Sequence, residues 1–64
     1  MKNYRVSIID WSKNGKMITT ITVKGIAEAK RFAKYWGIPT LEYHKDVTAW
    51  QGFTYQTECI AFEI

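Results

Sequence analysis

Apolar and polar residues alternate along the first part of the chain. Residues 3–11 place an apolar side chain at every second position over their first half, which is the period of a half-buried strand. Residues 17–24 are rich in Thr, Ile and Val, the types favoured in strands. Between them lies Asn14-Gly15, a strong hairpin signal, because both central residues of a type I′ turn need a positive φ angle. The pattern predicts a hairpin with Asn14 and Gly15 as its two-residue loop.

This loop also predicts how the two strands pair. Val6 would face Val23 and Ile8 would face Ile21, so the apolar positions of both strands agree on one side. That side would carry Tyr4, Val6, Ile8, Ile21 and Val23. The other side would carry Arg5, Ser7, Ile9, Trp11, Ile18, Thr20, Thr22 and Lys24, with Trp11 opposite Ile18.

Residues 26–36 carry apolar side chains at helical spacing. The stripe consists of Ile26, Ala29, Phe32, Ala33 and Trp36. Glu28 lies in the first turn and Lys34 near the last, as the helix dipole favours. Gly37 suits the left-handed position that follows many helices, and Pro39 prevents the helix from continuing. The segment is predicted to be one amphipathic helix.

A second hairpin is predicted from residues 40–50 and 53–64 around Gln51-Gly52, a weaker turn signal. It would pair Leu41 with Phe62, Tyr43 with Ile60, His44 with Cys59, Lys45 with Glu58 and Asp46 with Thr57. The apolar phase then shifts partway along the strand. A bulge or a longer loop within residues 47–52 would restore it.

These elements predict an α+β fold of the order ββαββ, in which two hairpins form a four-stranded antiparallel sheet and one helix packs on one face. Residues 1–64 would form a single small domain. The expected core is Tyr4, Val6, Ile8, Ile21, Val23, Ile26, Ala29, Phe32, Ala33, Trp36, Leu41, Tyr43, Ile60 and Phe62. A single helix leaves the opposite sheet face bare, and we expect function there.

Composition narrows the class of protein. Hydrophobic residues make up 47% of the chain and aromatic residues 16%, enough for a dense core in 64 residues. The single cysteine cannot form a disulfide within the chain, which is unlike small secreted domains. No stretch has the length of a membrane span, and the first residues lack the apolar region of a signal peptide. We therefore expect a cytoplasmic protein.

The bare sheet face is the first candidate binding surface. Aromatic and β-branched residues gathered on one face are typical of an interface with another protein or with a second copy of the chain. The predicted protein-binding residues are Ile9, Trp11, Ile18, Thr20 and Trp50. The alternative is that a loop or the second hairpin covers this face and makes it ordinary core.

A basic surface is the second candidate. The net charge is +3, which favours acidic partners. The residues that could contact phosphates are Arg5, Lys24, Lys30, Arg31 and Lys34. Exposed aromatic residues could stack on unpaired bases, the candidates being Trp11, Trp50, Phe53 and Tyr55. The alternative is a solvated helix face, the more common meaning of Lys and Arg on a helix.

Catalysis and metal binding are not expected. His44, Asp46 and Cys59 would share a face in the predicted second hairpin, an arrangement that suits a cysteine nucleophile or part of a metal site. The chain is short for a deep pocket, and no phosphate loop, dinucleotide motif or metalloprotease helix occurs. We expect no cofactor, no metal ion and no enzyme activity.

Residues 4–36 resemble the β-ribbon-plus-helix DNA-binding arm of tyrosine recombinases in element order: a strand, an Asn14-Gly15-Lys16 turn, a second strand and a helix rich in Ala and Lys. The likeness covers half the chain, contains no specific motif and lacks the third strand that those arms place before the helix. It assigns the chain to no family.

The sequence therefore predicts a non-catalytic binding module. The first hypothesis is a protein-binding regulator or inhibitor, similar in general character to small accessory proteins of phages and mobile elements, with a larger protein as partner and a homodimer also compatible. The alternative is a nucleic-acid-binding domain. A membrane partner is not expected.

Overall fold

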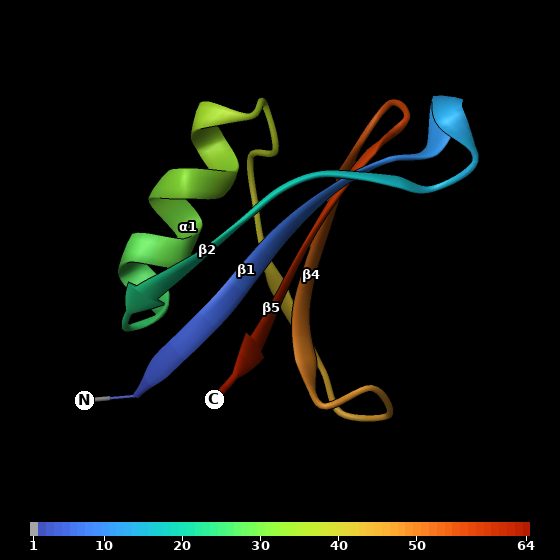
Figure 1. The fold of residues 1–64 in the computed structure, drawn as a ribbon. Coiled ribbons are helices and arrows are strands. Elements are labelled where there is room, and N and C mark those ends of the chain that lie inside the picture. The colour runs from blue at the N-terminus through green and yellow to red at the C-terminus, as the bar shows by residue number, and fades with distance from the viewer. Residues whose placement is uncertain (1) are drawn as a thin grey trace.

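The computed structural model describes residues 2–64 as a five-stranded antiparallel sheet with one α-helix (Figure 1). The elements are β1 (Asn3–Asp10), the 3-10 helix η1 (Trp11–Lys13), β2 (Lys16–Lys24), α1 (Ile26–Tyr35), β3 (Glu42–His44), β4 (Ala49–Thr54) and β5 (Thr57–Glu63). The strand order is β2-β1-β5-β4-β3, so the last strand of the chain is central. The predicted α+β class is confirmed. The predicted four strands are corrected to five, because the C-terminal part contributes three.

The first hairpin forms where the sequence predicts it, but its register differs by two residues. Val6 pairs with Ile21 rather than with Val23. The loop is longer than two residues, because the Asp10 carboxylate accepts hydrogen bonds from the backbone N–H and the hydroxyl of Ser12 and so starts η1. A shift of two residues keeps every side chain on its own face, since side chains alternate with a period of two. The predicted faces of residues 4–9 and 19–24 therefore hold although the predicted pairs are wrong, whereas beyond the bulge Met17 and not Ile18 pairs on the face away from α1.

The end of this loop has the backbone that the turn signal predicts. Asn14 and Gly15 adopt φ angles of 59° and 75°, both in the left-handed region. The five-residue loop does not by itself account for the observed pairing. The register of β1 and β2 also shifts between Ile8 and Ile9, which marks a β-bulge. Ile18 is the extra residue of this bulge, so it does not pair with Trp11 as predicted.

The C-terminal part differs more from the prediction. Gly52 lies inside β4 opposite Cys59, and the turns fall instead at residues 45–48 and at Tyr55-Gln56. The observed pairs include Tyr43 with Trp50, His44 with Ala49, Trp50 with Ala61 and Phe53 with Glu58. The predicted pairs of residues 41–46 with residues 57–62 are therefore wrong.

A close crossing explains why Gly52 is a glycine. A Cβ atom added there would overlap the carbonyl oxygen of Thr40 and lie 2.7 Å from Ile38 Cγ2. Glycine inside a strand often marks such a close approach of another backbone. Gly52 is thus needed for the segment that leads from α1 into β3, and not for a turn.

The helix ends as its sequence predicts. α1 stops at Tyr35, one residue before the predicted end, and Gly37 follows with a φ angle of 83°. The N–H of Gly37 donates to the carbonyl of Lys34, and the N–H of Ile38 donates to that of Ala33, each at 2.9 Å. This is a Schellman motif, which satisfies two otherwise free carbonyls.

The core lies between α1 and one face of the sheet. Its buried residues are Tyr4, Val6, Ile8, Ala29, Ala33, Ile38, Leu41, Cys59 and Ala61, with Ile21, Val23, Ile26, Phe32, Trp36 and Trp50 packed against them. Ile38, Cys59 and Ala61 were not predicted. Of the predicted core residues, Tyr43 and Phe62 are exposed, and Ile60 faces away from the core. These errors follow from the wrong pairing of the C-terminal strands.

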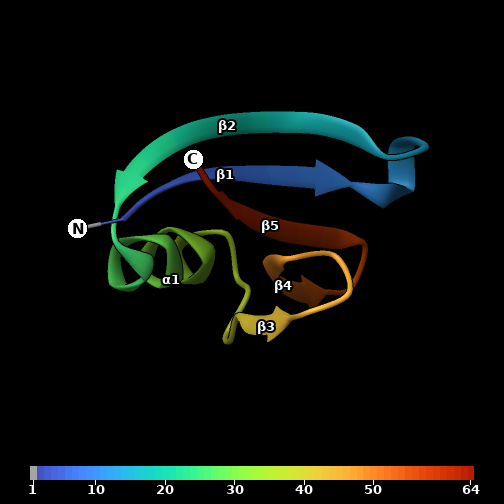
Figure 2. The same ribbon diagram turned by 90° about the horizontal axis from the view of Figure 1, so that it is seen from below.

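Two layers result from this arrangement. Figure 2 shows α1 under the β2–β1 side of the sheet and beside the β4–β3 side. Over residues 2–64, no helix or strand covers the opposite face of the sheet. The one α-helix of this part of the chain is too short to span a membrane.

Candidate functional site

The first candidate site is the side of the sheet away from α1, here named the open sheet face. Strand pairing places on it Arg5, Ser7 and Ile9 of β1, Met17, Thr20 and Thr22 of β2, Gln51 and Phe53 of β4, and Glu58, Ile60 and Phe62 of β5. Trp11 of η1 reaches this face at the turn end, since its indole contacts Glu58.

Several large apolar side chains are exposed on or beside this face. The exposed fraction lies between 42% and 61% for each of the five residues Trp11, Met17, Ile18, Phe53 and Phe62. Isolated exposed apolar residues are ordinary on a protein surface, whereas several on one sheet face are typical of a contact surface.

The buried carboxylate of Glu58 binds two side chains at the end of the open sheet face that lies next to η1. Glu58 is only 6% exposed, and its two oxygens accept hydrogen bonds from Trp11 Nε1 at 2.9 Å and from Gln51 Nε2 at 3.1 Å. The backbone N–H of Trp11 also donates to the carbonyl of Gln56 at 2.6 Å. The Trp11 ring lies against Gly15, where an added Cβ would be 2.7 Å from it. Trp11 is thereby held in one place although half of its surface is exposed.

The predicted protein-binding residues are only partly brought together. Ile9 and Thr20 lie on the open sheet face, and Trp11 and Ile18 border it. Trp50 does not, because it pairs with Ala61 and packs against the core on the other side of the sheet. Its predicted place beside Trp11 is therefore corrected. Met17 and Phe62 belong to the face but were not singled out, because the register that places them there includes a bulge and a β1–β5 pairing.

The predicted basic residues separate into two groups. Arg5 lies on the open sheet face, away from α1. Lys30, Arg31 and Lys34 of α1 line one cavity of about 270 Å³ together with Pro39, Thr40 and Leu41. Lys24 lies in a groove between β2 and α1 that Arg31 also lines.

His44 and Cys59 do not meet. His44 pairs with Ala49 at the edge of the sheet, whereas Cys59 is fully buried between Ile8 and Gly52. Burial and, secondly, the charge of Glu58 raise the pKa of Cys59 to about 11, so the thiol is protonated at neutral pH and is a poor nucleophile. Within residues 2–64, no three His, Cys, Asp or Glu side chains are grouped so that they could hold a metal ion.

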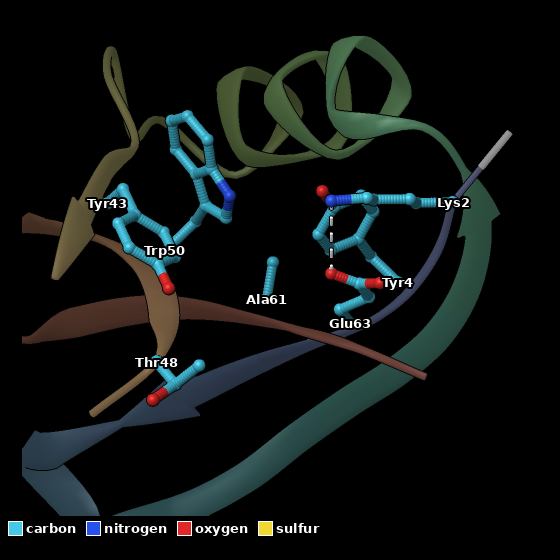
Figure 3. Close-up of a pocket in the computed structure, with 7 residues that line it drawn as sticks. All are labelled: Lys2, Tyr4, Tyr43, Thr48, Trp50, Ala61 and Glu63. Atoms are coloured by element: carbon cyan, nitrogen blue, oxygen red, sulfur yellow. Dashed lines mark ion pairs between the residues drawn. The ribbon is translucent and has the colours of Figure 1, made fainter. Parts of the chain in front are cut away.

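A second concave site lies on the helix side of the sheet (Figure 3). It is a cavity of about 220 Å³ with aromatic walls from three strands: Tyr4 of β1, Tyr43 of β3 and Trp50 of β4. The rings of Tyr43 and Trp50 meet edge to face, with centroids 5.6 Å apart. We name it the aromatic pocket. Sequence reasoning missed it, because it depends on the pairing of β4 and β5.

No protein-family model, curated protein or solved structure matches this chain.

Proposed function

We propose that the protein is a non-catalytic binding module that engages a partner protein through the open sheet face. The observation that carries this proposal is the exposure of five large apolar side chains on or beside one sheet face. Contact with a partner would remove this surface from water, and each square ångström of apolar area contributes on the order of 25 cal/mol to such burial. A regulator or inhibitor is the role that fits, since it needs binding alone, and the buried free thiol of Cys59 suits the cytoplasm.

The fixed position of Trp11 supports this function. Tryptophan is enriched among residues that dominate binding energy, and a side chain that is already ordered loses less entropy on binding. Trp11 is held by Glu58 and by the backbone of Gln56, yet its ring remains about half exposed. It therefore presents a preorganised anchor to a partner.

The charge at the end of the open sheet face away from η1 suggests which side chains a partner would place there. Arg5 of the open sheet face pairs with Thr22 at that end, so a cation lies there. A partner with acidic side chains there and an apolar patch opposite Met17 and Phe53 would be complementary.

The test is capture of a partner from the source cells by the purified full chain and by a Met17→Lys/Phe53→Lys variant. Both residues are exposed, so the variant should fold, and circular dichroism checks this. We expect a protein captured by the wild type, released by the double variant and retained by Tyr35→Lys, which changes an even more exposed aromatic residue on α1. The same protein bound by the double variant, or none bound by the wild type, would contradict the proposal. Sedimentation of the chain alone shows whether the partner is a second copy.

A second candidate function is nucleic-acid binding on the helix side. The specific observation is that Lys30 links the basic cavity of α1 to an aromatic surface, since its Nζ lies 5.2 Å from the ring centroid of Trp50. Lysine and arginine bind phosphates, and aromatic rings bind bases. Binding of any oligonucleotide should weaken steeply as salt is added, and a Lys30→Gln/Lys34→Gln variant should bind more weakly at low salt. Equal binding at low and high salt would exclude this function.

A further inference from the structure

The aromatic pocket exists because Ala61 is small. Ala61 pairs with Trp50 on one side and with Val6 on the other, so it lies at the centre of the sheet. Figure 3 shows its methyl group between Trp50 and Tyr4, which stand apart on either side of it. A larger side chain at position 61 would fill this space. The pocket therefore lies between two rings, above the methyl group of Ala61, which is itself fully buried.

Charges around the pocket decide which ligands suit it. Lys2 Nζ lies 3.6 Å from Glu63 Oε1 in the wall of the pocket (Figure 3). Lys30 does not line the pocket, but its Nζ lies 5.2 Å from the ring centroid of Trp50. The carboxylate of Glu63 is thus already paired with Lys2, whereas Lys30 has the ring of Trp50 as its neighbour. A cationic ligand, which aromatic cages otherwise favour, would meet the ammonium group of Lys2 in the pocket and that of Lys30 beside Trp50. A flat ligand that carries negative charge is the better match.

Thr48 lies at the rim of the pocket, in the turn between β3 and β4. Its φ angle is 53°, a conformation that is rare for a β-branched residue. Such backbone strain clusters at binding and active sites. The strained turn places Thr48 beside the mouth of the pocket, where Figure 3 shows its side chain below Trp50 and Ala61.

We propose that the aromatic pocket binds the base of a nucleotide, stacked against Trp50 and Tyr43, with the phosphate held by Lys30 or Lys2. Because Lys30 also belongs to the basic cavity of α1, phosphates of neighbouring nucleotides in a single strand would lie along Lys30, Arg31 and Lys34. The inference deepens the second candidate function and rests on it for the single-stranded ligand. A free mononucleotide offers the same base and phosphate, so the experiment includes both.

The test measures binding of the full chain to a labelled ten-residue thymidine oligonucleotide, to the same strand with abasic residues, and to thymidine monophosphate. Stacking of one base contributes on the order of 1–3 kcal/mol, so the abasic strand should bind roughly 5- to 150-fold more weakly. Tyr43→Ala, at a half-exposed position, should remove most of this difference, and Ala61→Val should do so by filling the pocket. Tyr35→Ala, which removes an exposed tyrosine elsewhere, should bind like the wild type.

The outcomes separate the pocket from the broader function. Salt-dependent binding that is equal for both strands would overturn the aromatic pocket as a base site and leave the basic surface standing. A base-dependent affinity that Tyr43→Ala and Ala61→Val do not reduce would also overturn it. Binding of the monophosphate alone would support the pocket and exclude single-stranded nucleic acid. Binding of none of the three ligands at low salt would contradict both.

Discussion

The two halves of the sheet contain similar strands, but they are positioned by different kinds of contact. The β1–β2 loop is held by its own residues: Asp10 bonds to Ser12, and Asn14 and Gly15 supply the left-handed backbone. The β3–β5 region is positioned by residues far away in the sequence, because Gly52 packs against residues 38–41 and β5 pairs with β1. A turn signal is dependable where neighbouring residues stabilise the turn, and it misleads where a glycine serves a segment far away in the sequence.

Substitution of Gly52 should show the largest effect. In Gly52→Ala, the added methyl group meets the Thr40 carbonyl and Ile38, so the backbone must move. Overpacking of this kind costs typically 1–3 kcal/mol, and contact with backbone favours the upper end, about 3 kcal/mol. Urea unfolding, followed by circular dichroism, measures the loss of unfolding free energy.

Gly37→Ala is the matched control. Gly37 also has a special backbone, with a φ angle of 83°, but the nearest atom to an added Cβ is Thr54 Cγ2 at 3.9 Å. Only backbone strain remains, at about 1–2 kcal/mol. If Gly52→Ala destabilises the protein no more than Gly37→Ala, the close crossing does not position the C-terminal half.

This contrast also explains how far the sequence could predict the structure. The α+β class, α1 with its Gly37 cap and the faces of the first hairpin follow from local periodicity and turn chemistry. The C-terminal strands do not, because the glycine of Gln51-Gly52 serves the crossing at Thr40, and β5 takes its place between β1 and β4. Trp50 was consequently placed on the wrong face, and the aromatic pocket over Ala61 could not be foreseen.

The next largest effect is a pH dependence of stability caused by Cys59, which lies in β5 between β1 and β4. Its pKa is raised from 9.0 to about 11 in the folded protein, mainly by burial. Well below pH 9 the thiol is protonated in the folded and unfolded chains, so it does not affect stability there. Between pH 9 and 11 the unfolded chain loses the proton first, and the unfolding free energy should fall by up to about 1.4 kcal/mol per pH unit.

Cys59→Ala isolates this contribution. Other groups titrate in the same range, but they are common to both proteins, so the difference between the two pH profiles belongs to Cys59. The wild-type profile should be steeper between pH 9 and 11 and parallel to the variant below pH 9. Parallel profiles over the whole range would mean that the thiol is open to solvent.

A smaller effect is expected where the first loop binds the last strand. Trp11→Phe keeps an aromatic ring but removes the indole N–H from Glu58 Oε1. A buried acceptor left without its donor costs about 1–3 kcal/mol, and water reaching the half-exposed Trp11 site should keep the loss near 1 kcal/mol. A double-mutant cycle with Glu58→Gln measures the coupling between the two side chains. Absence of coupling would mean that Trp11 is not fixed by this contact, and the proposed preorganised anchor would lose its basis.

The smallest effect should come from the ion pair that joins the start of β1 to the end of β5. Lys2 and Glu63 are both largely exposed and 3.6 Å apart, and exposed pairs of this kind contribute about 0–1 kcal/mol. Lys2→Gln should therefore change the urea midpoint very little. The same variant should weaken binding of a nucleotide in the aromatic pocket if Lys2 contacts the phosphate. Weaker nucleotide binding at unchanged stability would show that Lys2 contacts the ligand. A large loss of stability would show instead that Lys2 contributes to the fold.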